Sequence, residues 1–97
     1  MEALLKVSDP VKVLKNAKKY LGNNVKLAIS NRKDKKYMVY NPNLNKWIHF
    51  GNLNYEDFTR HGNITRRYHY LKRATNIKGN WKDNKYSPNN LAIHLLW

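Results

Sequence analysis

The chain has 97 residues, enough for one small hydrophobic core but not for two, so we expect residues 1–97 to form a single domain. It carries 19 Lys and Arg against 6 Asp and Glu, and the resulting net charge of +13 predicts a polyanionic partner. The absence of cysteine excludes a disulfide framework, a thiolate zinc site and a thiol nucleophile.

The first predicted element is a helix over residues 10–21. Ser8 or Asp9 can cap its start, Pro10 suits its first position, and Gly22 is a typical left-handed end. Apolar residues recur at helical spacing on one side of this helix, and lysines gather on the other. The lysines that we expect to contact phosphates are Lys12, Lys15 and Lys19.

Three short apolar runs follow, separated by segments rich in Asn, Asp and Pro that favour tight turns. They predict a three-stranded antiparallel sheet. The predicted strands cover residues 25–30, 36–40 and 46–51. In the third strand Trp47 and His49 alternate with Ile48 and Phe50, so one of these two pairs must face solvent.

The second half of the chain predicts helices again. Residues 52–62 are typical of a short helical turn, and residues 63–75 of a longer helix capped by Asn63. On the longer helix Ile64, Tyr68 and Leu71 share one side, which we expect to face the core. Its arginines lie on the other side, where they would be free to bind phosphate.

Arg67 is the exception on this helix, because it lies at the margin of the apolar side. A buried charge without a partner is costly, so we expect Arg67 to extend to water or to meet Glu56 or Asp57.

The last predicted helix follows a loop rich in Asn, Gly and Lys. It begins with Ser87 as cap and Pro88 at its first position. Its residues are apolar nearly all round, so it must pack into the core or into another protein. We assign Leu95, Leu96 and Trp97 as partner-binding residues.

These elements predict an α+β fold with an N-terminal helix, a three-stranded antiparallel sheet and C-terminal helices packed on one face. The predicted core residues are Leu14, Leu21, Leu27, Ile29, Val39, Ile48, Phe50, Phe58, Tyr68, Leu71, Leu91 and Leu95. No stretch approaches the roughly 18 apolar residues of a membrane span, so we expect none.

Basic residues interleaved with aromatic residues are the strongest functional signal. In nucleic-acid-binding proteins Lys and Arg neutralise phosphates, and exposed Trp and Tyr stack on unpaired bases. We expect this binding to be largely independent of sequence, with DNA favoured over RNA. The predicted nucleic-acid-binding residues are Lys12, Lys15, Lys19, Arg60, Arg66, Lys72, Arg73, Lys78, Trp81, Lys82, Lys85 and Tyr86.

Catalysis has little support in the sequence. Asp57 lies four residues before His61, which would place both on one helix face, and His69 follows nearby. However, there is no HExxH motif, no cysteine ligand and no cluster of carboxylates. We therefore predict no catalytic residue, no metal and no cofactor, and a metal-dependent nuclease using these three residues remains an alternative.

Five motifs carry a resemblance over residues 35–97. They are HFG (49–51), YEDFT (55–59) with His61, RRYHYLKR (66–73), NIKGNW (76–81), and SPNNLA with the terminal LLW. In these motifs the chain resembles a family of small, uncharacterised basic proteins of giant, mimivirus-like nucleocytoplasmic DNA viruses. The resemblance implies a viral protein, located in the virion interior or in a viral factory in the host cytoplasm. It implies no activity.

Charge, aromatic content and resemblance together predict a non-enzymatic nucleic-acid-binding protein that helps to condense, package or process a viral genome. The alternative is a minor capsid or internal virion structural protein that joins other virion proteins through its apolar C-terminus. A homo-oligomer is compatible with either hypothesis.

Overall fold

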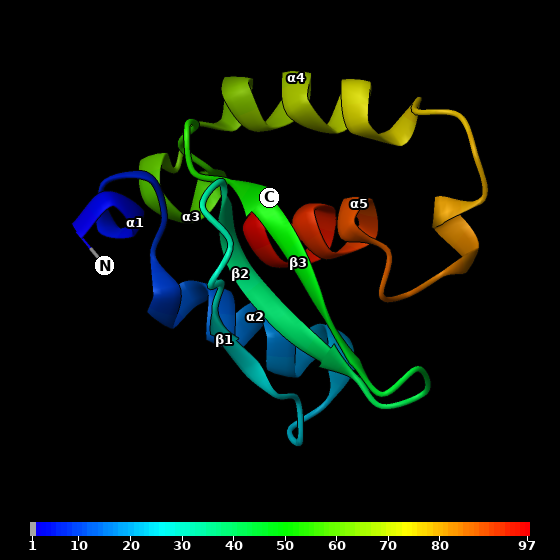
Figure 1. The fold of residues 1–97 in the computed structure, drawn as a ribbon. Coiled ribbons are helices and arrows are strands. Elements are labelled where there is room, and N and C mark those ends of the chain that lie inside the picture. Colours follow the sequence, from blue (N-terminus) through cyan, green and yellow to red (C-terminus); the bar gives the residue numbers. More distant parts are fainter. Residues whose placement is uncertain (1) are drawn as a thin grey trace.

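The predicted α+β fold is confirmed by a computed structural model, which describes residues 2–97 (Figure 1). A three-stranded antiparallel sheet is flanked by helices from both ends of the chain. The elements are α1 (Glu2–Val7), α2 (Pro10–Leu21), β1 (Leu27–Ile29), β2 (Lys35–Asn41), β3 (Lys46–Asn52), α3 (Phe58–His61), α4 (Ile64–Thr75), the 3₁₀ turn η1 (Trp81–Asp83), α5 (Pro88–Leu91) and the π-helical turn η2 (Ala92–Leu96).

Helix α2 has the predicted bounds because its end signals are local. The Asp9 carboxylate accepts hydrogen bonds from the backbone N–H groups of Val11 (3.1 Å) and Lys12 (3.4 Å), which have no partner inside the helix. Gly22 ends the helix at a φ of 100°. Helix α1, by contrast, was not among the predicted elements.

The sheet has the order β1-β2-β3, and its register decides which residues of β3 face solvent. Tyr37 pairs with Phe50 on the inner face, and both side chains are buried. Tyr40 pairs with Trp47 on the outer face, where the two rings meet edge to face. The alternation left open by the sequence is therefore settled, with the indole directed outward.

The core lies between the inner face of the sheet, α2 and the α5–η2 segment. Of the predicted core residues, Val39, Phe50, Leu91 and Leu95 belong to it. The prediction was wrong for three residues that are exposed, namely Leu14, Ile29 and Tyr68. Five others are only partly buried: Leu21, Leu27, Ile48, Phe58 and Leu71. The buried apolar cluster consists of Leu4, Val13, Ala17, Tyr37, Val39, Phe50, Leu91, Leu95 and Leu96.

The C-terminal residues pack inside this chain, which corrects their assignment as a partner-binding surface. Leu95 is 0% exposed and Leu96 is 2% exposed, because the η2 turn directs both into the core. Trp97 stacks on Tyr70 of α4, with ring centroids 4.2 Å apart and planes 9° from parallel. Leu95 and Leu96 are therefore not available to another protein.

No helix within residues 2–97 has both the length and the apolar character that crossing a bilayer requires.

Candidate nucleic-acid interface

Helix α4 turns a different face to the body of the protein from the one that its apolar pattern predicts. Ile64 and Tyr68 are 68% and 60% exposed, whereas Tyr70 is partly buried and Ala74 is buried. The reason is a contact with the C-terminus, since Trp97 stacks on Tyr70. Aromatic stacking adds to the area that it buries, so this contact outweighs the apolar stripe in setting the rotation of the helix.

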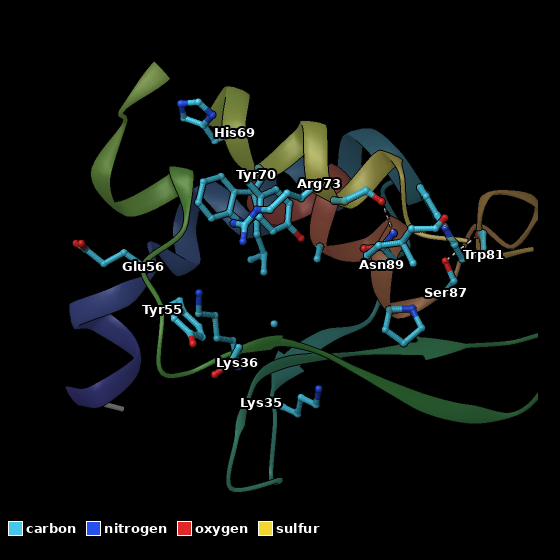
Figure 2. Close-up of a pocket in the computed structure, with 18 of the residues that line it drawn as sticks. Lys35, Lys36, Tyr55, Glu56, His69, Tyr70, Arg73, Trp81, Ser87 and Asn89 are labelled. Atoms are coloured by element: carbon cyan, nitrogen blue, oxygen red, sulfur yellow. Dashed lines mark hydrogen bonds between the residues drawn. The ribbon is translucent and has the colours of Figure 1, made fainter. Parts of the chain in front are cut away.

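A cavity of about 1000 Å³ lies beneath α4, between this helix and the β2–β3 strands, with α5 at its back (Figure 2). We call this cavity and its lining the α4 groove. Asn89 of α5 donates a hydrogen bond to the carbonyl of Ala74 on α4 (3.1 Å) and so links the two helices beside the cavity. The lining residues are Lys35, Lys36, Gly51, Asn52, Tyr55, Glu56, Arg66, His69, Tyr70, Arg73, Ala74, Ile77, Lys78, Trp81, Ser87, Pro88, Asn89, Ala92, Leu96 and Trp97.

The α4 groove carries an excess of positive charge. Its lining contains five cationic side chains and a single side-chain carboxylate, that of Glu56. Arg66 pairs with Glu56 at 3.2 Å, and Lys36 pairs with the buried Asp57 at 3.1 Å. These are the ion pairs that form within residues 2–97. The three cations of the lining that have no carboxylate partner in this part of the chain are Lys35, Arg73 and Lys78.

Aromatic rings line the same cavity. Tyr55 is 67% exposed and stands at the strand side, as Figure 2 shows. Tyr70 and Trp97 form the stacked pair under α4, and burial raises the pKa of Tyr70. Trp81 lies at the far end, held by a hydrogen bond from its Nε1–H to the carbonyl of Ile77 (2.7 Å).

The segment that presents Trp81 is ordered by one buried amide. Asn90 Nδ2 donates to the carbonyl oxygens of Trp81 (2.8 Å), Asn84 (2.9 Å) and Lys82 (3.3 Å). Ser87 caps α5 and also donates its hydroxyl hydrogen to the Trp81 carbonyl (2.9 Å). A segment predicted as plain loop is therefore a structured wall of the α4 groove.

A buried polar network supports the opposite wall. Lys36 Nζ donates to Asp57, which also accepts a hydrogen bond from the Thr59 hydroxyl. Ser8 lies 3.3 Å from Thr59 and accepts a hydrogen bond from Tyr37 (2.8 Å). Burial lowers the pKa of Lys36, and the neighbouring Asp57 carboxylate partly offsets this. The network joins β2, α3 and the α1–α2 junction, and so fixes the strand that carries Lys35 and Lys36.

Four of the predicted binding residues line the α4 groove: Arg66, Arg73, Lys78 and Trp81. The lysines of α2 do not, because that helix lies on the other side of α5 from α4 (Figure 1). The predicted binding residues are therefore divided between the α4 groove and at least one other surface. The other predicted residues outside the groove are Arg60 on α3, Lys72 on the exposed part of α4, and Lys82, Lys85 and Tyr86 in the segment after it.

Lys82 and Lys85, which are predicted to bind nucleic acid, each lie close to an aromatic ring of the protein. Lys85 Nζ lies 5.1 Å from the centre of the Tyr20 ring, and Lys82 Nζ lies 5.5 Å from the centre of the Trp81 ring. Tyr86 is partly buried against the core, so only part of its ring is open to a base, and its stacking role stays a prediction.

The predicted binding residues do not include Lys35, Tyr55 and Tyr70, which line the α4 groove, although Tyr70 is one of the aromatic residues that interleave with basic ones in the sequence. Lys35 is the first residue of β2 and Tyr55 follows β3, and only the folded chain brings them into one cavity with Arg73 of α4. The sequence does show Tyr70 among the basic residues of α4. This signal identifies a site residue only once the fold shows that the ring faces the cavity.

The residues considered for an acid–base site form separate contacts. Asp57 is committed to Lys36 and Thr59, and His61 Nδ1 accepts a hydrogen bond from the Asn63 backbone N–H (2.8 Å). Burial is the main cause that lowers the pKa of His61. Arg67, by contrast, donates from Nε to the Trp97 main-chain oxygen (2.6 Å), instead of meeting Glu56 or Asp57.

Within residues 2–97 no three His, Cys, Asp or Glu side chains gather in a way that could hold a metal ion.

A family model described as "Family of unknown function (DUF5754)" matches residues 25–74, slightly more than half of the chain. The matched segment runs from β1 to α4 and contains Lys35, Lys36, Arg66 and Arg73 of the α4 groove. No curated protein and no solved structure matches the chain.

Proposed function

The chain belongs to this family of unknown function (DUF5754), and we propose that it binds nucleic acid, largely independently of sequence, without catalysing a reaction on it. The α4 groove supports this proposal most directly. It combines cations that have no carboxylate partner among residues 2–97 with several aromatic rings, and these are the two features that proteins use to hold phosphates and bases.

The remaining surface supports the same proposal. Lys12, Lys15, Lys18 and Lys19 are exposed on α2, and neither ion pair within residues 2–97 involves them. Such charges attract a polyanion over distances of about a Debye length, roughly 8 Å at physiological salt. We therefore assign α2 to non-specific attraction and the α4 groove to closer contact.

The role of this binding follows only from the resemblance to basic proteins of giant DNA viruses. That resemblance predicts a part in genome condensation, packaging or processing, and this role stays a prediction. The structural alternative is not the function that we propose, because Leu95 and Leu96, which would have bound its partner, lie in the core.

A salt series tests the proposal. We expect fluorescence anisotropy to show binding of labelled single-stranded and duplex oligonucleotides, with the logarithm of the association constant falling linearly with the logarithm of salt concentration. The slope reports the number of neutralised phosphates. Absence of binding to DNA and to RNA near physiological salt would refute the proposal. Labelled heparin, another polyanion without bases, serves as the control for attraction by charge alone.

A further inference from the structure

We infer that the α4 groove receives a short stretch of an unpaired nucleic-acid strand, with phosphates held by Lys35, Arg73 and Lys78 and a base against the aromatic wall. The inference rests on the proposed function and adds to it the form of the nucleic acid and the place of its tightest contact.

The size of the cavity favours an unpaired strand. Its volume of about 1000 Å³ corresponds to the upper end of pockets that enclose small molecules. A nucleotide of a flexible single strand can turn its base into such a cavity. A double helix keeps its bases paired and stacked, so entry of a base would first require unpairing. Duplex DNA can therefore contact the rim of the α4 groove but not its interior.

The electrostatics of the lining favour phosphate. The carboxylate of Glu56 is neutralised by Arg66, and that of Asp57 lies buried beneath Lys36. Consequently Lys35, Arg73 and Lys78 face the cavity without an opposing carboxylate within residues 2–97. Apolar lining residues such as Ala92 and Leu96 reduce the water around these charges, which strengthens their attraction for an anion.

The aromatic rings of the lining provide the contact with the base. Tyr55 is exposed and can place its ring against a base, and Trp81 and the Tyr70–Trp97 stack lie in the same cavity. Every base presents a π-face, so stacking of this kind tolerates any sequence. A free nucleotide has the same chemistry as one in a strand, and the test must separate the two.

Tryptophan fluorescence provides a direct readout. Trp47 lies on the outer face of the sheet, so the variant Trp47→Phe leaves Trp81 and Trp97, which both line the α4 groove. We expect oligothymidylate to quench this fluorescence at concentrations where a duplex hairpin with the same number of phosphates quenches much less. Thymidine monophosphate, which lacks the neighbouring phosphates, should require at least about tenfold higher concentration.

Matched charge changes locate the contact. Arg73→Glu changes a cation of the α4 groove, and Lys15→Glu makes the same reversal on exposed α2. We expect Arg73→Glu to lower the affinity for oligothymidylate about tenfold more than Lys15→Glu does, and both to weaken duplex binding to a similar extent. Tyr55→Ala, which leaves charge unchanged, should reduce single-strand affinity and quenching while leaving duplex affinity within about twofold. Circular dichroism and thermal melting confirm that each variant is folded.

Three results would overturn the inference. Equal binding of single strand and duplex, with equal losses for Arg73→Glu and Lys15→Glu, would show that nucleic acid binds the general surface, and the proposed function would survive. Equal affinity for thymidine monophosphate and oligothymidylate would make a free nucleotide the occupant. If no nucleic acid binds near physiological salt, the proposed function and the inference fail together.

Discussion

Lys36 and Asp57 form a buried ion pair, with Nζ and Oδ2 separated by 3.1 Å and both side chains almost completely shielded from water. A buried ion pair adds little to the free energy of unfolding compared with apolar residues of similar size. Removal of one partner, however, leaves the other charge buried without compensation. The pair joins β2 to the residue that precedes α3, so it also fixes the strand side of the α4 groove.

Asp57→Asn should therefore be strongly destabilising. We expect the free energy of unfolding to fall by about 3 kcal/mol, because the Lys36 charge keeps its desolvation penalty and loses its counter-charge. Urea denaturation followed by circular dichroism measures this change. Glu56→Gln is the matched control, since its pair with Arg66 is 43% and 47% exposed and should be worth less than about 1 kcal/mol. Equal losses for the two variants would show that burial of the Lys36 pair has no energetic consequence.

Tyr37 makes the stability sensitive to alkaline pH. Burial raises the pKa of Tyr37 from 10.0 to about 12, and the hydroxyl donates a hydrogen bond to Ser8. The folded state holds this proton more tightly than the unfolded state. Its stabilising effect is therefore complete below pH 10 and is lost as the pH rises toward 12. The difference in pKa corresponds to roughly 2 to 3 kcal/mol.

Urea midpoints measured between about pH 8 and pH 11 test this dependence. Tyr37→Phe should be less stable at neutral pH by about 1 kcal/mol, the value of a typical hydrogen bond, but should lose less stability on the alkaline side. Comparison of the two proteins cancels the contribution of Lys36, whose lowered pKa has the opposite sign. Parallel alkaline curves would contradict a buried, protonated Tyr37.

At Gly51 the backbone adopts a conformation that disfavours other residues, and the neighbouring atoms leave no room for a side chain. Its φ is +82°, and a Cβ there would approach Leu96 Cδ1 and Lys36 Cβ to 3.0 Å. We expect Gly51→Ala to lower the free energy of unfolding by about 2 to 4 kcal/mol, from backbone strain and overpacking together.

Gly62→Ala is the control that separates these two causes. Gly62 also has a positive φ, of +62°, but a Cβ there would meet nothing within 4 Å. This variant should lose only about 1 kcal/mol, which is the cost of the left-handed conformation. If thermal melting shows the same loss for both variants, the crowding between β2, β3 and η2 is unimportant.

Asn90 orders the segment that presents Trp81, and its role can be tested by an isosteric change. Asn90→Asp would place a carboxylate against three carbonyl oxygens that now accept hydrogen bonds from the amide. We expect a loss of at least about 2 kcal/mol and faster amide hydrogen exchange over residues 76–87. Asn23→Asp, at an exposed turn, makes the same chemical change and should leave both measurements nearly unaltered.

Local signals explain which elements could be predicted. Asp9, Asn63 and Ser87 each cap the helix that follows them, and Gly22 and Gly62 end helices, so these boundaries depend on neighbours in the sequence. Helix α1 has no comparable cap signal before it, and its place depends on contact with α3.

The site depends on contacts between distant segments, and this is why the sequence predicted it only in part. Ile64 and Tyr68 have the spacing of a core-facing stripe, yet the stack between Tyr70 and Trp97 sets the rotation of α4. Arg73 was expected to point away from the core and instead lines the cavity. The spacing of apolar residues predicts an amphipathic helix. It cannot show which face of that helix will pack on Trp97, which lies 27 positions after Tyr70 in the sequence.

The π-helical turn η2 sets the direction in which the last side chain of the final helix points. Trp97 donates its backbone N–H to the carbonyl of Ala92 (3.2 Å), five positions back instead of the four of an α-helix. If the same residues were wound as a regular α-helix, each step would turn the chain further around the axis and the indole would point away from Tyr70. Helix α4, which covers the cavity, would then lose its stacking contact with Trp97, although no residue of α4 had changed.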